Sequence, residues 1–555
     1  MTARKARRPA TGRQLANRFV LAFLVVLALA GLYGLAGFGR GVRVTADVKP
    51  ASTAGRLQVS SALVACPSPG LRPPIGGDIA ETSAPASTGN GQVTLTRLHL
   101  VTAAKPVTTV STRPQPGQLT VTSIHQALVV KKAKSAMPSM AGGAVPTSLA
   151  NGGLIVAATG SAAQGFDVEQ LSPGGQPSAR CEAPGSDFWF IGPETTKLNT
   201  LLYLVNADDA PADAHVGVQT DSGPRLGAPD SGIVVPPHSM VVQNVDKLVR
   251  SAKAAALHVT TSTGRVVAAV RETSKSGKAG IWLPPAPAPA TTQVLTGLPD
   301  TTGTRELFIT VPGGASARVK VTAVTPRGTY QPTGGSGISL LGRLTTGIAL
   351  PSLSGFAGSV KISSNVPVTA VLEVSGGPDG APGAFVSGSG PVTEQGVVTG
   401  PAGKAGTTEI VLSAPGKAAT VRIGQAAPGT PVTGQSGQLV TIKARSATKV
   451  KLKLPKKAGA ATLMAVVVTP QPGSGPVYAA RVAISGGNVM TVLAVGSSPT
   501  RIDLPAVRES LARVLGSLRP AGPGAAARRQ DLTPRLDSQG RPPGDRARAA
   551  LRTPR

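Results

Sequence analysis

The residues with the most distinctive chemistry in this 555-residue chain are its two cysteines, Cys66 and Cys181. Both follow an apolar N-terminal segment that is expected to direct export, and an oxidising compartment permits disulfides. We therefore predict a structural disulfide between them. A bond that closes a loop of about 115 residues contributes on the order of 4 to 5 kcal/mol to stability. A metal site would need further thiols or nearby histidines, and a catalytic thiol would need a recognisable partner.

Motifs for catalysis are missing from the sequence. The five histidines never have the HExxH spacing or a comparable ligand spacing. We find no GxSxG elbow, no P-loop and no GxGxxG after a predicted strand. We accordingly predict no catalytic residue, no cofactor site and no metal site. The 26 acidic residues leave one alternative open, because the two carboxylates of a glycosidase need not be neighbours in sequence.

Two short segments have side chains that could bind a ligand. Asp208, Asp209 and Asp213 supply hard oxygen ligands for calcium, but they lack EF-hand spacing and sit between two predicted strands, as an ordinary hairpin loop would. The aromatic run SDFWF at 186–190 could stack on a sugar, although such a cluster more commonly packs a core. We assign a site to neither segment.

The N-terminal region predicts a membrane anchor. Residues 19–38 contain no charge, and a helix of that length just spans a hydrocarbon core about 30 Å thick. Six basic residues precede the segment, and only Arg40 and Arg43 closely follow it, so the N-terminus is expected in the cytoplasm and the rest outside. The alternative is a signal peptide cleaved after Ala30. Both interpretations predict export.

The positive charge of the chain is spread rather than clustered. The formal net charge is +30. Eight basic residues lie in the first 43 positions, and nine arginines and three aspartates lie from Arg519 onward. The remainder is dispersed, which argues against a nucleic-acid partner and fits either a polyanionic envelope or a simple solubility charge. From Leu518 the chain is rich in Pro, Gly and Arg, and we expect it to be disordered.

Repeats predict an all-β exported region. The segments 201–223, 307–328 and 410–429 each show an apolar strand, a turn of small residues and an alternating strand. A period of about 100 residues is the size of a β-sandwich domain. We therefore predict tandem β-sandwich-like modules after the transmembrane helix, each with its own valine-rich core, and folding independently of the disulfide. A β-propeller with two blades of 40 to 50 residues per repeat is the alternative. Four aromatics are expected to close the module cores: Trp189, Trp282, Phe385 and Tyr478.

Linkers and composition divide the chain into seven parts. The proline-rich stretch 284–290 is predicted to be a stiff extended spacer, and 375–383 and 396–406 are predicted to be glycine-rich loops. The predicted parts are a cytoplasmic basic tail (1–18), the anchor (19–38), a membrane-proximal β domain with the disulfide (44–190), three β modules (191–290, 291–400 and 401–505) and a disordered basic tail (506–555).

Several motifs resemble a known family. The anchor, the CPSP motif at 66–69 and the run CEAPGSDFWFIGP at 181–193 resemble actinobacterial envelope-associated proteins known only as a domain of unknown function. The most distinctive element is the cysteine pair with the W-F-x-G motif, here Trp189, Phe190 and Gly192. The resemblance implies a location in the envelope and a β-rich architecture, and it implies no chemistry.

These observations favour a non-enzymatic protein of the bacterial cell envelope. It would be a single-pass membrane protein whose extracytoplasmic modules form a scaffold or binding arm. The expected partners are the membrane and either anionic wall polymers or envelope-assembly proteins, with no nucleic acid. The alternatives are an exported carbohydrate-active or peptide-processing enzyme with dispersed carboxylates, and a polyanion-binding adhesin.

Overall fold

A computed structural model of the chain describes part of its length. The chain divides into two compact units, Arg56–Ile502 and a second unit formed by Met1–Gly55 with Asp503–Arg555. The predicted anchor and both predicted tails lie outside the described residues, and among the residues that are described no helix is long and apolar enough to cross a membrane. The described residues are 56–67, 78–82, 91–97, 99–102, 118–122, 128–130, 153–160, 163–171, 179–192, 198–225, 232–245, 252–274, 280–353, 355–375, 383–401, 406–426, 437–452, 463–485, 488–498 and 500–503.

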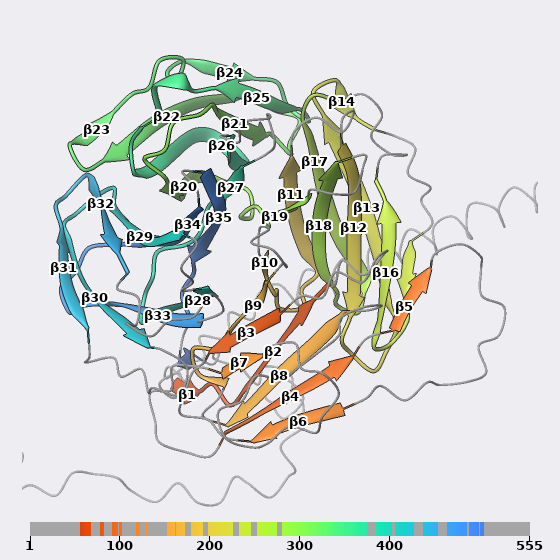
Figure 1. Cartoon of the computed structure of the whole chain (residues 1–555). Coiled ribbons are helices and arrows are strands. Elements are labelled where there is room, and N and C mark those ends of the chain that lie inside the picture. Colours follow the sequence, from red (N-terminus) through yellow and green to blue (C-terminus); the bar gives the residue numbers. More distant parts are fainter. Residues whose placement is uncertain are drawn as a thin grey trace, which may run out of the picture. The chain divides into compact units, whose positions relative to one another are not determined.

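The unit Arg56–Ile502 is built from four copies of one two-sheet repeat, which we name repeats A to D (Figure 1). Repeat A contains β2 (Ser61–Cys66), β3 (Asp78–Thr82), β4 (Gly91–Arg97), β5 (His99–Thr102), β6 (Gln118–Thr122), β7 (Leu128–Val130), β8 (Leu154–Gly160), β9 (Asp167–Leu171) and β10 (Ala179–Arg180). Repeat B contains β11 (Asp187–Gly192), β12 (Leu198–Asn206), β13 (Ala212–Thr220), β14 (Gly223–Pro224), β15 (Ile233–Val235), β16 (Ser239–Asn244), β17 (Ala255–Thr263), β18 (Val267–Ser274) and β19 (Gly280–Leu283).

The two later repeats follow the same plan. Repeat C contains β20 (Ala290–Leu298), β21 (Arg305–Thr310), β22 (Ala317–Thr325), β23 (Gly328–Tyr330), β24 (Ile338–Leu340), β25 (Thr345–Ala349), the 3-10 helix η3 (Pro351–Leu353), β26 (Gly358–Val374) and β27 (Ala384–Ser387). Repeat D contains β28 (Gly396–Pro401), β29 (Gly406–Ala414), β30 (Ala419–Ala426), β31 (Gln438–Ile442), β32 (Ser446–Lys451), β33 (Leu463–Pro470), β34 (Tyr478–Ser485) and β35 (Asn488–Val495). Outside the repeats, β1 (Arg56–Gln58) pairs with β36 (Arg501–Asp503).

Within each repeat the chain crosses repeatedly between two sheets. In repeat D the first sheet has the order β28-β33-β30-β31 and the second has the order β32-β29-β34-β35. Repeats A and B have the same arrangement, except that β5, which repeat A contributes, pairs in parallel with β16 at the edge of a repeat B sheet. In repeat C the 17-residue β26 runs through both layers. Because each sheet draws strands from the whole repeat, it is not a propeller blade of 40 to 50 consecutive residues. The prediction of tandem all-β, sandwich-like modules is confirmed.

Burial along the strands explains why they form. In β22 the side chains alternate, so that Val319, Val321 and Ala323 are buried whereas Arg318 and Lys320 are exposed. Such alternation is typical of a strand with one face on the core. The predicted repeats at 201–223, 307–328 and 410–429 correspond to β12–β13, β21–β22 and β29–β30, which occupy equivalent places in repeats B, C and D.

The limits of the repeats differ from the predicted domain limits by part of a strand. The limit at 190/191 falls inside β11, the limit at 290/291 falls at the start of β20, and the limit at 400/401 falls inside β28. Each of these strands opens a repeat and pairs far ahead in the sequence, as β11 does with β17. The membrane-proximal domain predicted at 44–190 largely coincides with repeat A, which has the same two-sheet plan as the others.

Repeats A and D each have a core cluster of their own, whereas three further clusters contain residues of two neighbouring repeats, so the cores are not fully separate. Tyr203 and Trp282 of repeat B pack with Ala65 and Ile155 of repeat A. The other shared cores add Phe308, Val371 and Phe385 of repeat C to the core of repeat B, and Val411, Ala480, Val482 and Val492 of repeat D to the core of repeat C. Repeat D in turn contacts repeat A through β28 and β9.

Candidate functional site

The last strands of all four repeats meet around one cavity. The cavity has a volume of about 210 Å³ and lies where β10, β19, β27 and β35 approach one another (Figure 1). A well-packed interior leaves few voids larger than a water molecule, so a space of this size is a candidate binding site. Its walls are mainly apolar, and each repeat supplies part of them: Arg180 and Glu182 from repeat A, Trp282 and Leu283 from B, Phe385 and Ser387 from C, and Leu493 and Ala494 from D.

The repeat B wall is organised around Trp282. The ring of Tyr203 packs against Trp282 with 5.3 Å between ring centroids, and the Arg271 guanidinium lies 5.7 Å from the centroid of the Trp282 ring. Burial raises the pKa of the Tyr203 hydroxyl and lowers that of the Arg271 guanidinium, and the interaction between these two side chains opposes both shifts. Trp282 is therefore held between an aromatic neighbour and a cation, which fixes the position of this wall.

The proline-rich linker forms another wall, and hydrogen bonds hold it in place. Ser387 Oγ donates to the carbonyl of Pro285 at 2.6 Å, and Thr369 Oγ1 donates to the carbonyl of Pro287 at 2.7 Å. The backbone N–H of Ala286 donates to the carbonyl of Trp189 at 2.7 Å. The predicted spacer at 284–290 is thus extended and also anchored to repeats B and C, so Pro284 and Pro285 line the cavity as fixed groups.

A charged cluster stands at the repeat A end of the cavity. Arg180 Nε donates to Asp167 Oδ1 at 2.8 Å, and Arg180 Nη1 donates to the carbonyl of Ala494 at 2.6 Å. Burial raises the pKa of the nearby Glu182 carboxyl, and the charge of Asp167 acts in the same direction, whereas Arg180 opposes both. The guanidinium of Arg180 is thus committed to Asp167 and to repeat D, and Glu182 remains as a half-buried acid on the cavity wall.

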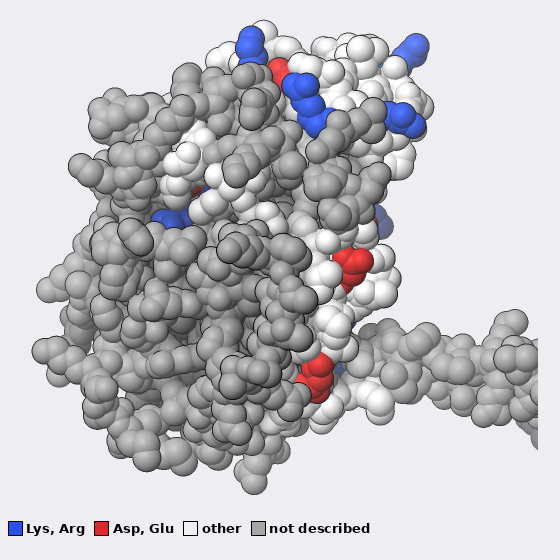
Figure 2. Space-filling view, turned by 90° about the vertical axis from the view of Figure 1, so that its right-hand side faces the viewer, with Lys and Arg blue, Asp and Glu red and all other residues white. Residues whose placement is uncertain are grey.

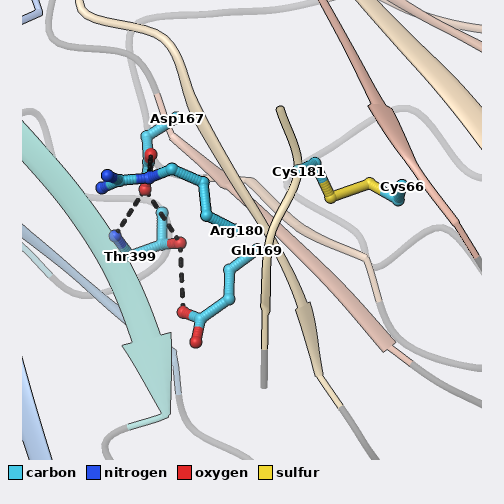
Figure 3. Close-up of a disulfide and its surroundings, with 6 residues drawn as sticks. All are labelled: Cys66, Asp167, Glu169, Arg180, Cys181 and Thr399. Carbon is cyan, nitrogen blue, oxygen red and sulfur yellow. Dashed lines mark hydrogen bonds and ion pairs between the residues drawn. A yellow bond between two sulfur atoms is a disulfide. The ribbon is translucent and has the colours of Figure 1, made fainter. Parts of the chain in front are cut away.

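The predicted disulfide is present beside this cluster. Cys66 and Cys181 are bonded, with their Cα atoms 4.6 Å apart, and both side chains are buried. Arg180 and Cys181 are neighbours in the chain but point in opposite directions, Arg180 toward Asp167 and Thr399 and Cys181 toward Cys66 (Figure 3). The disulfide therefore ties the end of β2 to the segment after β10, which supports the residues that bring Arg180 and Glu182 to the cavity.

The three aspartates considered for calcium point to different partners. Asp208 forms a bidentate pair with Arg265, at 2.7 and 3.0 Å. Asp209 accepts from His238 at 2.7 Å, and Asp213 accepts from Ser262 at 3.3 Å. Across the described part of the chain, no group of three or more His, Cys, Asp or Glu side chains could hold a metal ion. These aspartates belong to the turn between β12 and β13 and to the start of β13.

The aromatic residues singled out in the sequence occupy three kinds of position. Trp189 in β11 is 5% exposed and stacks on His258, with 3.9 Å between ring centroids. Trp282 and Phe385 hold equivalent positions in the last strands β19 and β27 and line the cavity, whereas Tyr478 begins β34. The aromatic run at 186–190 thus packs mainly in the interior, and the aromatic positions do not all repeat.

Surface charge on the face in Figure 2 is scattered. The Lys and Arg side chains drawn there lie singly or in small groups, most of them toward its upper end, and the Asp and Glu side chains lie singly both among them and below them. The described residues on this face therefore show no continuous basic patch, in keeping with the dispersed charge of the sequence.

Sequence reasoning missed the cavity and its residues Arg180, Glu182 and Leu493. Glu182 lies within the run at 181–193 and Arg180 directly precedes it, but only the cysteine and the aromatic residues of that run drew attention in the sequence. Leu493 lies in a repeat that diverges in sequence. One signal was available in the sequence: each of the four last strands is followed within a few residues by a proline. These prolines are Pro184, Pro284, Pro391 and Pro499.

Comparisons with known proteins place the chain in a family. A search among curated proteins finds no match. One similar solved structure is an α-L-rhamnosidase from Streptomyces avermitilis in complex with L-rhamnose; it is 12% identical, and the alignment covers 77% of this chain and 58% of the rhamnosidase chain at a TM-score of 0.10. Residues 135–455, more than half of the chain, match the model of a family of unknown function (DUF5719), and the chain therefore belongs to that family.

Proposed function

We propose that this protein is a non-enzymatic binding protein of the bacterial cell envelope, anchored by residues 19–38 with repeats A to D outside the cell. The observation that carries the proposal is the cavity at which the last strands of all four repeats meet. Shared cores hold these strands in a fixed relation, as expected of a scaffold that presents one preformed site. The disulfide is compatible with an oxidising compartment.

Location is the first property to test. In intact cells that express the full chain with a tag at each end, added protease should remove the C-terminal tag and spare the N-terminal tag, because the positive-inside rule places the basic N-terminus in the cytoplasm. Immunoblots of both tags give the readout, and cells made permeable before digestion provide the control. A protected C-terminal tag contradicts the orientation. A mature N-terminus at Gly31 shows that the segment is cleaved instead of retained.

Binding is the second property. The tagged full chain, crosslinked in cells and purified from solubilised envelope, should retain a specific envelope component, identified by mass spectrometry and by glycan analysis. The matched control is the Gly496→Phe protein, in which a large side chain enters the cavity from a position where a Cβ atom meets nothing within 4 Å. A component lost from the control supports the proposal. Hydrolysis of a glycan or peptide panel by the purified protein would contradict it.

A further inference from the structure

The carboxylates at the repeat A end of the cavity outnumber the cations beside them. Arg180 pairs with Asp167 at 2.8 Å, and Arg481 pairs with Glu169 in a fully buried contact. Glu182 is the third carboxylate of the group, and among the described residues no side chain donates a hydrogen bond to it. The group therefore carries one more negative than positive charge when all its members are ionised.

An acid in this position favours a cationic ligand. Burial opposes ionisation of Glu182, and the charge of Arg180 offsets this only in part, because Arg180 is bound to Asp167 and to carbonyl groups of repeat D. A partly buried carboxylate that shares its nearest cation with another acid is costly, and a cation brought into the cavity would offset that cost. The remaining walls suit an apolar group, because Phe190, Trp282 and Phe385 all line the same space.

We propose that the cavity binds a small organic ammonium ion, whose cationic head pairs with Glu182 and whose apolar body packs against Trp282 and Phe385. The inference rests on the proposed function, since it names the class of ligand for the binding cavity. Arg271 already lies over the Trp282 ring, so the ammonium group is assigned to Glu182 and the apolar body to the aromatic walls. A volume of about 210 Å³ limits the ligand to a small molecule or to the tip of a side chain.

Two probes of nearly equal shape test the role of charge. Benzylammonium and benzyl alcohol differ mainly in the charge of the head group, and their Kd values follow from the rise of the melting temperature with probe concentration. The full chain in detergent at pH 7.5 should bind benzylammonium about tenfold more tightly than benzyl alcohol, as expected of a charge-assisted hydrogen bond. In the Glu182→Gln protein this preference should disappear, while binding of benzyl alcohol is retained.

Two glycine variants test the place of binding. Gly496→Phe should abolish binding of both probes, and it also supplies the blank for partition into the detergent. Gly313→Phe is the matched control, because a Cβ atom at Gly313 also meets nothing within 4 Å and Gly313 lies outside the cavity. Equal affinity for the two probes, an unchanged preference in Glu182→Gln, or normal binding by Gly496→Phe would each overturn the inference.

The outcome stays clear if one variant fails. Should Glu182→Gln not fold, the comparison of the two probes on the wild-type protein and the pair of glycine variants decide the question. If neither benzylammonium nor benzyl alcohol binds, the ligand class alone is refuted, because membrane location and capture of an envelope component are measured separately. If the wild-type protein captures no specific envelope component but still binds benzylammonium, the proposed function alone is refuted.

Discussion

Two glutamates face each other across neighbouring strands in repeat C. Glu306 in β21 is the register partner of Glu373 in β26, and on its other side Glu373 is opposite Phe385 of β27. Burial, together with the like charge of Glu306, raises the pKa of Glu373 from 4.5 to about 7. The pair lies on the sheet face that contributes Phe308 and Phe385 to the core shared with repeat B, so Glu373 lies beside that interface.

Replacement of Glu373 by Gln should flatten the pH dependence of stability. The folded chain holds the Glu373 proton more tightly than the unfolded chain does, so this contribution is complete below about pH 4.5 and is lost as pH rises through about 7. The loss is on the order of 3 kcal/mol. Denaturant titrations between pH 4 and 8 measure it. Glu306→Gln removes the like charge and should move the fall in stability to lower pH. Identical pH profiles for the wild type and Glu373→Gln would show that Glu373 is not the group whose pKa is raised.

The glycine of the W-F-x-G motif, Gly192, is explained by a further glutamate, Glu272. A Cβ atom at Gly192 would lie 2.8 Å from Glu272 Oε1 and 3.1 Å from Leu283, so the absence of a side chain makes room for that buried carboxylate beside the cavity wall. The sequence marked Gly192 as distinctive but could not give this reason, because Glu272 lies in β18, far along the chain.

Among the elements, β9, β28 and β34 join the first repeat to the last. Glu169 of β9 pairs with Arg481 of β34, and both side chains are at most 1% exposed. The carbonyl of Thr399 in β28 accepts from Arg481, and its backbone N–H donates to Asp167 of β9 at 2.9 Å. A buried ion pair of this kind gives little net stability, because desolvation offsets the attraction, yet removal of one partner is costly. These contacts fix the position of repeat D against repeat A.

Arg481→Met should therefore destabilise the protein by about 3 to 5 kcal/mol, because Glu169 would remain as a buried charge without its counter-ion. The double variant Glu169→Leu with Arg481→Met should recover most of that loss, since neither charge remains. Urea denaturation of the four proteins in the cycle measures the coupling. Equal destabilisation by the single and double variants would show that the pair does not act as a unit.

At this scale the sequence predicts strands better than it predicts their partners. The alternation of Val319, Lys320 and Val321 shows which face of β22 is buried, and the repeats near 201, 307 and 410 identify equivalent strands. Pairing between strands that are distant in sequence, such as β28 with β33, depends on tertiary packing that a local pattern does not encode. The cavity was beyond prediction for the same reason, because its walls come from four repeats.

The molecule as a whole should respond to loss of the disulfide as one cooperative body. The bond between Cys66 and Cys181 closes a separation of 115 residues within repeat A, and its loss should cost on the order of 4 to 5 kcal/mol. Separate modules would confine the damage to repeat A. The cores that repeats B, C and D share, together with the pairing of Arg481 with Glu169, connect every repeat to its neighbours instead.

The double variant Cys66→Ser with Cys181→Ser should thus melt several degrees lower in a single transition, because repeat D loses its packing when repeat A unfolds. Calorimetry gives the number of transitions, and hydrogen exchange gives a local readout for amides of β29 and β34 in repeat D. Their protection should fall together with that of β8 in repeat A. Wild-type protein under reducing conditions provides the control without substitution. Two separate transitions, with protection in β29 and β34 unchanged, would mean that the shared cores do not couple the repeats and that each repeat folds on its own.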